Sequence, residues 1–330
     1  MAGVELADIY AARARIASVA RRTALIPSPS LSARAGADVR LKLEFLQDTG
    51  SFKVRGAANT ILALDAPARA KGVVTVSTGN HGRAVAHVAR LVGTKAIVCL
   101  SNLVPENKRA AIRALGAELV VHGQSQDDAA EIAFDLVRTR GMTMVNPFDD
   151  ARVVAGQGTI GIELLEDFPE IDSVLVPVSG GGLISGIARA LKSARRDLRV
   201  IGVSMDRGAA MHASLAAGKP VLVPDVDTLA DSLQGGIFLD NAHTFSMVRE
   251  LVDDLVLVTE EEIGRAMAYA FDREHLCLEG GGAVGIAAIL AGKAGKLGRH
   301  AAIVLSGTNV AAPVLTRVTA EQRAWLDGAA

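Results

Sequence analysis

Residues 178–186 read V-S-G-G-G-L-I-S-G and join a short apolar run, 173–178, to a stretch of helical character. Adjacent glycines let the backbone approach an anion closely and turn several N–H groups towards it. The N-terminus of the following helix adds a favourable dipole. The segment lacks the G-x-G-x-x-G spacing and the Lys-Ser/Thr ending of nucleotide-binding loops. It therefore predicts a strand-to-helix turn, which is either a phosphate cup or a plain tight turn.

Short apolar runs alternate with helical stretches on both sides of this turn. The runs are nearly continuous in apolar residues, as expected of parallel strands buried on both faces. The strand candidates are residues 39–45, 73–77, 96–100, 118–121, 142–145, 173–178, 199–203, 255–258 and 301–305. The helical stretches carry preferred end signals. Pro105 and Gly116 bound one predicted helix, Gly141 ends another at 126–140, and Thr259 and Glu262 form a capping box. We therefore predict an α/β fold with right-handed crossovers.

The division into domains must come from the strands, because no Pro-, Gly- or Ser-rich linker divides the chain. The strand candidates between residues 73 and 148 can close a small sheet of their own. We predict a small domain of residues 73–148 and a large domain of residues 1–72 plus 149–330. The expected ligand site is the cleft between two such lobes.

Composition excludes several classes of function. The chain has 330 residues, with 35 Lys and Arg against 36 Asp and Glu, so a nucleic-acid partner is not expected. No apolar run approaches the roughly 20 residues that span a bilayer, and the first ten residues do not resemble an export signal. We expect a cytoplasmic protein without a membrane partner. Two cysteines, Cys99 and Cys277, lie in apolar runs and are expected to be core thiols.

Two further segments carry candidate chemistry. Residues 77–82, S-T-G-N-H-G, offer hydroxyl, amide and helix-start N–H groups that suit a carboxylate or a ring hydroxyl, or else a plain helix cap. Residues 49–56, T-G-S-F-K-V-R-G, place Lys53 in the first turn of a helix, where a cation opposes the dipole. An apolar Phe52 beside it favours the free amine, which a Schiff-base lysine needs. The alternative is a solvated surface lysine.

Two more turns end on polar residues. Residues 304–309, V-L-S-G-T-N, place Ser306 at the end of the last strand, either in the cleft or as a strand cap. Residues 278–283, L-E-G-G-G-A, make Glu279 either a cleft carboxylate or a helix cap. The histidines show no metal-ligand spacing.

In this order, the segments resemble the threonine dehydratase and serine racemase family of pyridoxal-phosphate enzymes, which have the tryptophan-synthase-β-like fold (fold type II). The resemblance runs from about Thr23 to Val310. Its pieces are T-x-L-x-x-S-x-x-L at 23–31, L-K-L-E-F-L-Q-D-T-G-S-F-K-V-R-G-A at 41–57, S-T-G-N-H-G, A-G-Q-G-T at 155–159, the glycine turn and the terminal S-G-T-N. The resemblance implies a two-domain α/β fold with parallel-rich twisted sheets and flanking helices.

The resemblance also implies roles for individual residues. Lys53 would hold pyridoxal 5'-phosphate through a Schiff base and act as the base on the substrate. Asn80 would bind the ring hydroxyl and Ser306 the ring nitrogen. The further cofactor contacts would be Phe52, Ser179, Gly180, Gly181, Gly182, Leu183, Ser232 and Glu279. The substrate carboxylate would be bound by Ser77, Thr78, Asn80 and His81, largely through backbone N–H groups.

The implied activity is β-elimination on a small β-hydroxy amino acid such as L-threonine or L-serine, by a dehydratase (ammonia-lyase) that forms homodimers. Thr78 stands where racemases of the family place a catalytic serine, so an amino-acid racemase is the alternative. A rival of another class is a non-catalytic protein that binds a phosphorylated metabolite.

The sequence departs from the family pattern at several positions. Ser204 replaces a glutamate that binds a divalent cation in metal-activated members, and Ala210 replaces the second carboxylate, so we expect no metal there, with Asp206 the residue that could still support one. Ser232 and Gln234 add polar groups near the cofactor. The stretch T-L-A-D-S-L-Q-G-G-I at 228–237 looks like the hydroxyectoine-utilisation branch, which implies a substrate derived from hydroxyectoine.

Overall fold

The computed structural model describes residues 3–328 except 78 and 105. Its larger sheet has six strands in the order β1-β2-β10-β7-β8-β9. Neighbouring strands are parallel throughout this sheet except for the antiparallel pair β1–β2. The strands are β1 (Leu25–Pro27), β2 (Asp38–Lys42), β7 (Ser173–Pro177), β8 (Arg199–Met205), β9 (Asp254–Val258) and β10 (His300–Val304).

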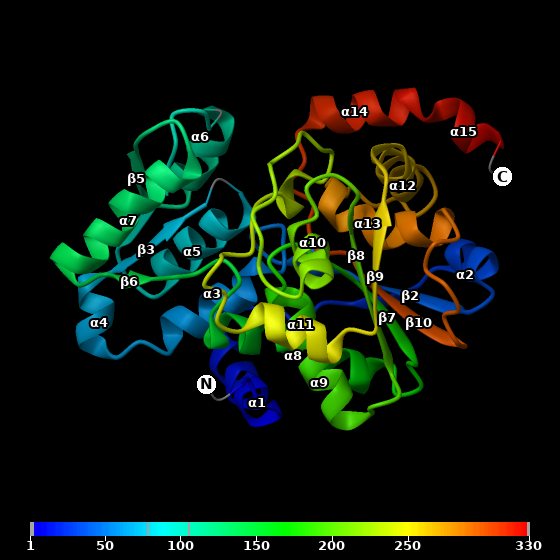
Figure 1. Cartoon of the computed structure of the whole chain (residues 1–330), viewed down its shortest axis with the longest axis horizontal. Helices are drawn as coiled ribbons and strands as arrows, with labels where there is room; N and C mark the ends of the chain where they lie inside the picture. The colour runs from blue at the N-terminus through cyan, green and yellow to red at the C-terminus, as the bar shows by residue number, and fades with distance from the viewer. Residues whose placement is uncertain (1–2, 78, 105, 329–330) are drawn as a thin grey trace.

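The smaller sheet has four parallel strands in the order β5-β4-β3-β6. It lies to the left in Figure 1, with helices on both of its faces. Its strands are β3 (Val73–Val76), β4 (Ala96–Leu100), β5 (Glu118–Val121) and β6 (Thr143–Met144), and its helices are α5 (Asn80–Leu91), α6 (Glu106–Ala114) and α7 (Gln126–Arg140). The α/β fold class with parallel-rich sheets is confirmed.

The remaining helices connect or cover the strands of the larger sheet. Figure 1 shows α14 and α15 together along one edge of the molecule. These elements are α1 (Leu6–Ile16), α2 (Pro29–Ala35), η1 (Glu44–Leu46), α3 (Lys53–Leu62), α4 (Ala66–Lys71), α8 (Ala151–Asp167), α9 (Gly182–Ala194), α10 (Ala210–Ala217), η2 (Asp231–Leu233), α11 (Thr244–Leu251), α12 (Glu260–Asp272), α13 (Gly280–Leu290), α14 (Ala312–Glu321) and α15 (Arg323–Gly328).

Helices cover both faces of the larger sheet, which explains why a central strand such as β7, S-V-L-V-P, is buried along its whole length. On one face, Leu175 of β7 belongs to an apolar cluster that includes Ile263 of α12 and Ile286 of α13. On the other face, Val174 of β7 packs in a cluster that includes Ile160 of α8. Alternate residues of one strand therefore enter two separate cores, as in parallel sheets buried on both sides.

Two details differ from the sequence expectations. Strand β1 was not predicted, because three residues that end in Pro27 carry no periodic signal. The expectation that Cys277 is a core thiol is wrong, because Cys277 is exposed. It lies in an extended segment before α13, where alternation turns Leu278 inward and its neighbour outward.

Among the described residues, no helix is long and apolar enough to cross a membrane.

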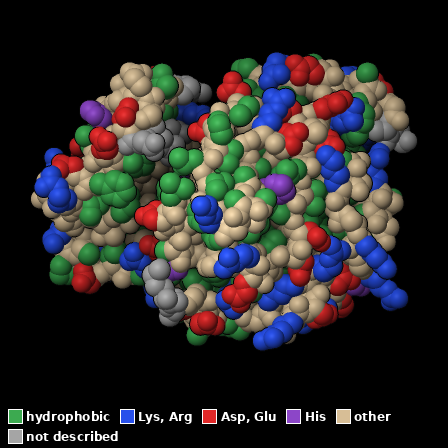
Figure 2. Space-filling model, in the orientation of Figure 1, with side chains coloured by type: hydrophobic (Ala, Val, Ile, Leu, Met, Phe, Trp, Pro, Cys, Tyr) green, Lys and Arg blue, Asp and Glu red, His purple; other side chains and the backbone are tan. Residues whose placement is uncertain are grey.

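Side chains of both charge signs interleave over the face shown in Figure 2. This mixture fits a chain with a formal net charge of −1.

Candidate active site

Lys53 is the first residue of α3, and the end of strand β10 fixes its place. The backbone N–H of Phe52 donates to the carbonyl oxygen of Ser306 at 3.1 Å. Ser51 forms an antiparallel bridge with Gly307. Residues separated by about 250 positions in the sequence are thereby joined, so Lys53 and Ser306 meet at the carboxyl edge of the larger sheet.

The amine of Lys53 has an unusual environment for a lysine. Its Nζ donates to the carbonyl oxygen of Pro147 at 2.7 Å and lies 5.3 Å from the centre of the Phe52 ring. Burial lowers the pKa of Lys53 to about 8, although the Glu279 carboxylate acts in the opposite direction. Within the described residues it forms no ion pair. An amine that is easily deprotonated suits nucleophilic and base chemistry.

The glycine loop, Ser179–Leu183, connects β7 to α9 and offers unused backbone donors. Gly181 has a φ of +88°, a conformation that favours glycine. In the described part of the chain, the N–H groups of Gly181, Gly182 and Leu183 donate to no protein acceptor. Several free N–H groups at a helix N-terminus form an anion-binding site, so the loop fits a phosphate group.

Phe148 links this loop to the lysine. A Cβ atom on Gly180 would lie 2.3 Å from the Phe148 ring, and one on Gly182 would lie 2.9 Å from the Phe148 carbonyl oxygen. The preceding residue, Pro147, accepts the hydrogen bond from Lys53. The amine and the glycine loop therefore lie against one short segment. A group that carries both an aldehyde and a phosphate fits these residues.

Glu279 is a buried carboxyl at the start of α13, only 4% exposed. It accepts a hydrogen bond from Nδ2 of Asn80 at 2.7 Å, and the Ser232 side chain and the Asn309 backbone also favour its ionised form, which lowers its pKa. Burial, followed by the nearby charge of Asp231, raises the pKa of Glu279 to about 7. This carboxyl can therefore hold or release a proton near neutral pH.

His81 lies in the first turn of α5, and its ring is directed at the backbone of Val145. Its Nε2 is 2.9 Å from the Val145 carbonyl oxygen, which can only accept, so Nε2 carries the hydrogen. Burial lowers the pKa of His81 to about 3, which keeps the ring neutral. The Oγ of Ser77 accepts from the Gly79 N–H at 3.4 Å. Thr78 lies outside the described residues.

The other polar candidates, Ser306, Ser204 and Gln234, each donate a hydrogen bond to a backbone carbonyl oxygen. Ser306 is buried, and its Oγ donates to the Gly281 carbonyl oxygen at 3.4 Å. Ser204 donates to the carbonyl oxygen of Val178 at 2.8 Å. Gln234 donates to the Val226 carbonyl oxygen at 2.7 Å, so its side chain serves its own loop. Gly280, Gly281 and Gly282 form the first turn of α13 rather than a turn before it, and they pack closely, because a Cβ on Gly281 would lie 2.2 Å from Oγ of Ser232.

Sequence reasoning missed an aromatic pair beside the glycine loop. The rings of Phe148 and Phe238 stack with centres 4.6 Å apart. Phe238 adopts a φ of +63°, which is rare for a bulky side chain. The motifs in the sequence contain no signal for this contact, because the two residues come from separate loops and neither loop has a periodic pattern.

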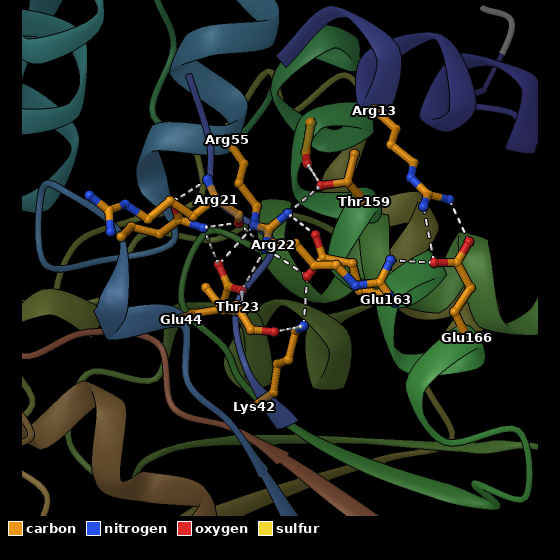
Figure 3. A network of polar contacts seen from close by, with 12 residues as sticks. Arg13, Arg21, Arg22, Thr23, Lys42, Glu44, Arg55, Thr159, Glu163 and Glu166 are labelled. Carbon is orange, nitrogen blue, oxygen red and sulfur yellow. Dashed lines mark hydrogen bonds and ion pairs between the residues drawn. The ribbon is translucent and has the colours of Figure 1, made fainter. Parts of the chain in front are cut away.

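Behind α3 lies a buried ion network, defined here as Lys42, Glu44, Arg55 and Glu163 (Figure 3). Arg55 donates to Glu44 at 2.8 Å and to Glu163 at 2.6 Å. Lys42 donates to Glu163 at 2.6 Å. Because Arg55 follows Lys53 by two residues, the network fastens the start of α3 to β2 and α8.

Comparisons with known proteins agree with this geometry. The family described as pyridoxal-phosphate dependent enzyme matches residues 16–308. A putative threonine dehydratase of Sinorhizobium fredii is 50% identical over 310 residues, which cover 94% of this chain and 93% of that protein. An L-threonine ammonia-lyase of Thermotoga maritima is 41% identical over 315 residues, which cover 96% and 78%.

Solved structures of the same kind are similar over almost the whole chain. Maize serine racemase has a TM-score of 0.91 and 33% identity, and the match covers 99% of this chain and 100% of that one. Threonine deaminase isoform 2 of Solanum lycopersicum has a TM-score of 0.88 and 35% identity, with 96% and 86% covered. The chain therefore belongs to the family of pyridoxal-phosphate-dependent enzymes, with fold type II and with threonine dehydratases and serine racemases as its relatives.

Proposed function

We propose that this enzyme is an ammonia-lyase that eliminates water from a small β-hydroxy amino acid, such as L-threonine or L-serine, and yields a 2-oxo acid and ammonia. One observation carries the proposal. A poorly solvated lysine amine and a glycine loop with free N–H groups contact the same segment, Pro147 and Phe148. The names of the Sinorhizobium fredii and Thermotoga maritima relatives support the choice of reaction and substrate.

The residues that would hold the cofactor surround these two features. Bound pyridoxal phosphate supplies an electron sink that makes the substrate α-proton acidic. The glycine loop would bind the phosphate, Lys53 the aldehyde carbon, Asn80 the ring hydroxyl and Ser306 the ring nitrogen. The remaining contacts would come from Phe52, Ser232 and Glu279.

The chain's own groups then orient the substrate and move the proton. The start of α5, with Ser77, Thr78, Asn80 and His81, would bind the substrate carboxylate through N–H groups, which a helix N-terminus favours. Lys53 would take the α-proton at its Nζ, because its lowered pKa makes the free amine accessible. We propose Thr78 as a second catalytic hydroxyl.

The proposal includes the domain division. Residues 73–148 would form a small domain that closes over the larger one, formed by residues 1–72 and 149–330. Strands β3 to β6 fall within this range and form their own sheet, which supports the division. Closure would exclude water from the substrate.

Finer assignments rest on the sequence resemblance. We propose a homodimer, a cytoplasmic location and no nucleic-acid or membrane partner. The stretch at 228–237 supports a substrate derived from hydroxyectoine. The Ser232 side chain favours the ionised form of Glu279, so this stretch contributes a polar group beside the site.

A racemase is the second candidate, because maize serine racemase is so similar in structure. Incubation of the holoenzyme with L-threonine, L-serine and hydroxyectoine-derived β-hydroxy amino acids separates the two reactions. We expect ammonia and 2-oxo acid in equal amounts. Mainly D-amino acid would overturn the lyase proposal. A Thr78→Ala variant should lose any racemisation, because the hydroxyl that racemases of the family place at this position is removed.

A further inference from the structure

Arg83 lies on α5 one turn after Asn80, at the edge of the proposed site. It is half-buried, and within the described residues it has no carboxylate at ion-pair distance. Its Nη1 instead donates to Oδ1 of Asn309 at 2.9 Å. A cation that serves a neutral amide costs more to bury than one paired with an acid, so this contact needs an explanation.

Arg83 begins a polar relay, defined here as Arg83, Asn309, Asn80 and Glu279. Nδ2 of Asn309 donates to Oδ1 of Asn80 at 2.6 Å and to the Thr49 carbonyl oxygen at 2.9 Å. Nδ2 of Asn80 donates to Oε1 of Glu279 at 2.7 Å. Each amide therefore accepts from the residue before it and donates to the residue after it.

The Arg83 end of the relay fixes its direction. A guanidinium group only donates hydrogen bonds, so Asn309 must turn its oxygen towards Arg83 whether or not Glu279 carries a proton. If the Asn309 amide were rotated, its NH₂ would face Arg83 and its oxygen would face Oδ1 of Asn80. Both contacts would repel, and each buried polar group left without a partner is costly.

Packing also restricts where the side-chain amide of Asn309 can lie. Gly50 has a φ of +73°, and a Cβ atom there would lie 2.8 Å from Oδ1 of Asn309. The amide is therefore enclosed by backbone on one side and by the relay on the other.

We propose that Arg83 is a positioning residue that sets the amide polarity of Asn309 and, through it, of Asn80. Asn80 then presents its NH₂ group, rather than its oxygen, towards Glu279 and towards a ligand beside it. This inference rests on the proposed function, in which that ligand is the ring hydroxyl of pyridoxal phosphate. A hydroxyl or its anion accepts a hydrogen bond from such a donor.

Three variants separate polarity from structure. Arg83→Leu removes the cationic donor. Asn309→Asp keeps an acceptor for Arg83 but removes the donor to Asn80, so Asn80 must turn over. Arg83→Lys keeps a donor-only cation. Arg90→Leu, an exposed position on the same helix, is the matched control.

The readout is the equilibrium dissociation constant of the apoprotein for pyridoxal phosphate and for 3-deoxypyridoxal 5'-phosphate, which lacks the ring hydroxyl. We expect Arg83→Leu and Asn309→Asp to bind pyridoxal phosphate about tenfold more weakly, and the deoxy analogue as wild type does. Arg83→Lys should recover most of the affinity, and Arg90→Leu should match wild type.

Two outcomes would overturn the proposal. One is unchanged affinity for pyridoxal phosphate in both variants, and the other is an equal loss for the two ligands, which indicates general loosening. Thermal melting of each apoprotein confirms folding. If the wild-type holoenzyme forms D-amino acids instead of ammonia, the lyase assignment fails while the two affinities still decide the role of Arg83.

Discussion

Two cations that lie two residues apart on α3 have opposite surroundings. Arg55 is bonded to both Glu44 and Glu163, whereas Lys53 donates to a carbonyl oxygen and pairs with no acid among the described residues. Burial on its own would raise the pKa of Glu44, but the Arg55 guanidinium holds it below its usual value. The pKa of Lys53 is lowered. A compensated charge supports the fold, and an uncompensated one is available for chemistry.

The two environments also differ in what offsets the free-energy cost of burying a charge there. Lys42, Glu44, Arg55 and Glu163 sum to zero charge and satisfy one another by hydrogen bonds. Buried ion pairs of this kind contribute little net stability when intact, but removal of one partner is strongly destabilising. At Lys53, no ion pair among the described residues offsets the free-energy cost of burying the amine, because a ligand is expected to complete this site.

The largest effect is expected from Lys53→Ala. This change should lower turnover of the β-hydroxy substrate by at least about 10⁴-fold, because it removes both the proposed attachment point of the cofactor and the proposed base. The apoprotein should melt at or above the wild-type temperature, because a poorly solvated amine is removed. Ammonia release and calorimetry provide the two measurements. Turnover within tenfold of wild type would contradict the claim that Lys53 serves the chemistry whereas Arg55 supports the fold.

Arg55→Met should show the converse pattern. It leaves the carboxylates of Glu44 and Glu163 without their main partner, so we expect a loss of about 3–5 kcal/mol in the free energy of unfolding. Denaturant unfolding of the apoprotein measures it. If this variant loses less than about 1 kcal/mol, the network is not the support that we infer.

Glu279→Gln tests the buried carboxyl near Lys53 through the pH dependence of the unfolding free energy. The pKa of Glu279 is raised from 4.5 to about 7, so the folded state binds the proton more tightly than the unfolded state. This contribution to stability is fully present below pH 4.5 and is lost as the pH rises through 7. Between pH 4.5 and 8, the unfolding free energy of Glu279→Gln should fall by about 3 kcal/mol less than that of wild type.

The exposed Glu170→Gln is the matched control for that titration, because its side chain faces solvent. Parallel pH profiles for wild type and Glu279→Gln would show that the carboxyl is not held protonated.

The smallest effect is expected at the outer edge of Figure 3, where Arg13 pairs with Glu166. Both side chains are about 40% exposed, at 39% and 40%. Solvent screens such pairs, so Arg13→Ala should cost no more than about 1 kcal/mol. Equilibrium unfolding beside Arg55→Met measures the difference. If Arg13→Ala lowered the free energy of unfolding as much as Arg55→Met, burial would not determine how much these ion pairs contribute to stability.

The sequence predicted the elements well where local signals were strong. The helix at Gln126–Arg140 has the predicted bounds, because Ser125 caps its start and Gly141 ends it in a left-handed conformation. The capping box of Thr259 and Glu262 is confirmed. Strand β1 carried no such signal, since its pairing with β2 is set by tertiary structure.

The site could be predicted only as far as its motifs reach. Lys53 and the glycine loop lie in motifs that a reader can find in sequence. Asn309 also lies in such a motif, but its contact with Arg83 could not be predicted from it, because the two residues are 226 positions apart. The Phe148–Phe238 stack likewise depends on how two loops meet. These contacts follow from the folded arrangement rather than from a local pattern.

The most direct test of the central claim is to locate the cofactor on the chain. Reduction of the holoenzyme with borohydride, followed by proteolysis and mass spectrometry, identifies the residue that carries a phosphopyridoxyl group. We predict a single labelled peptide, modified at Lys53. A label on another lysine, or none on any peptide, would contradict the account.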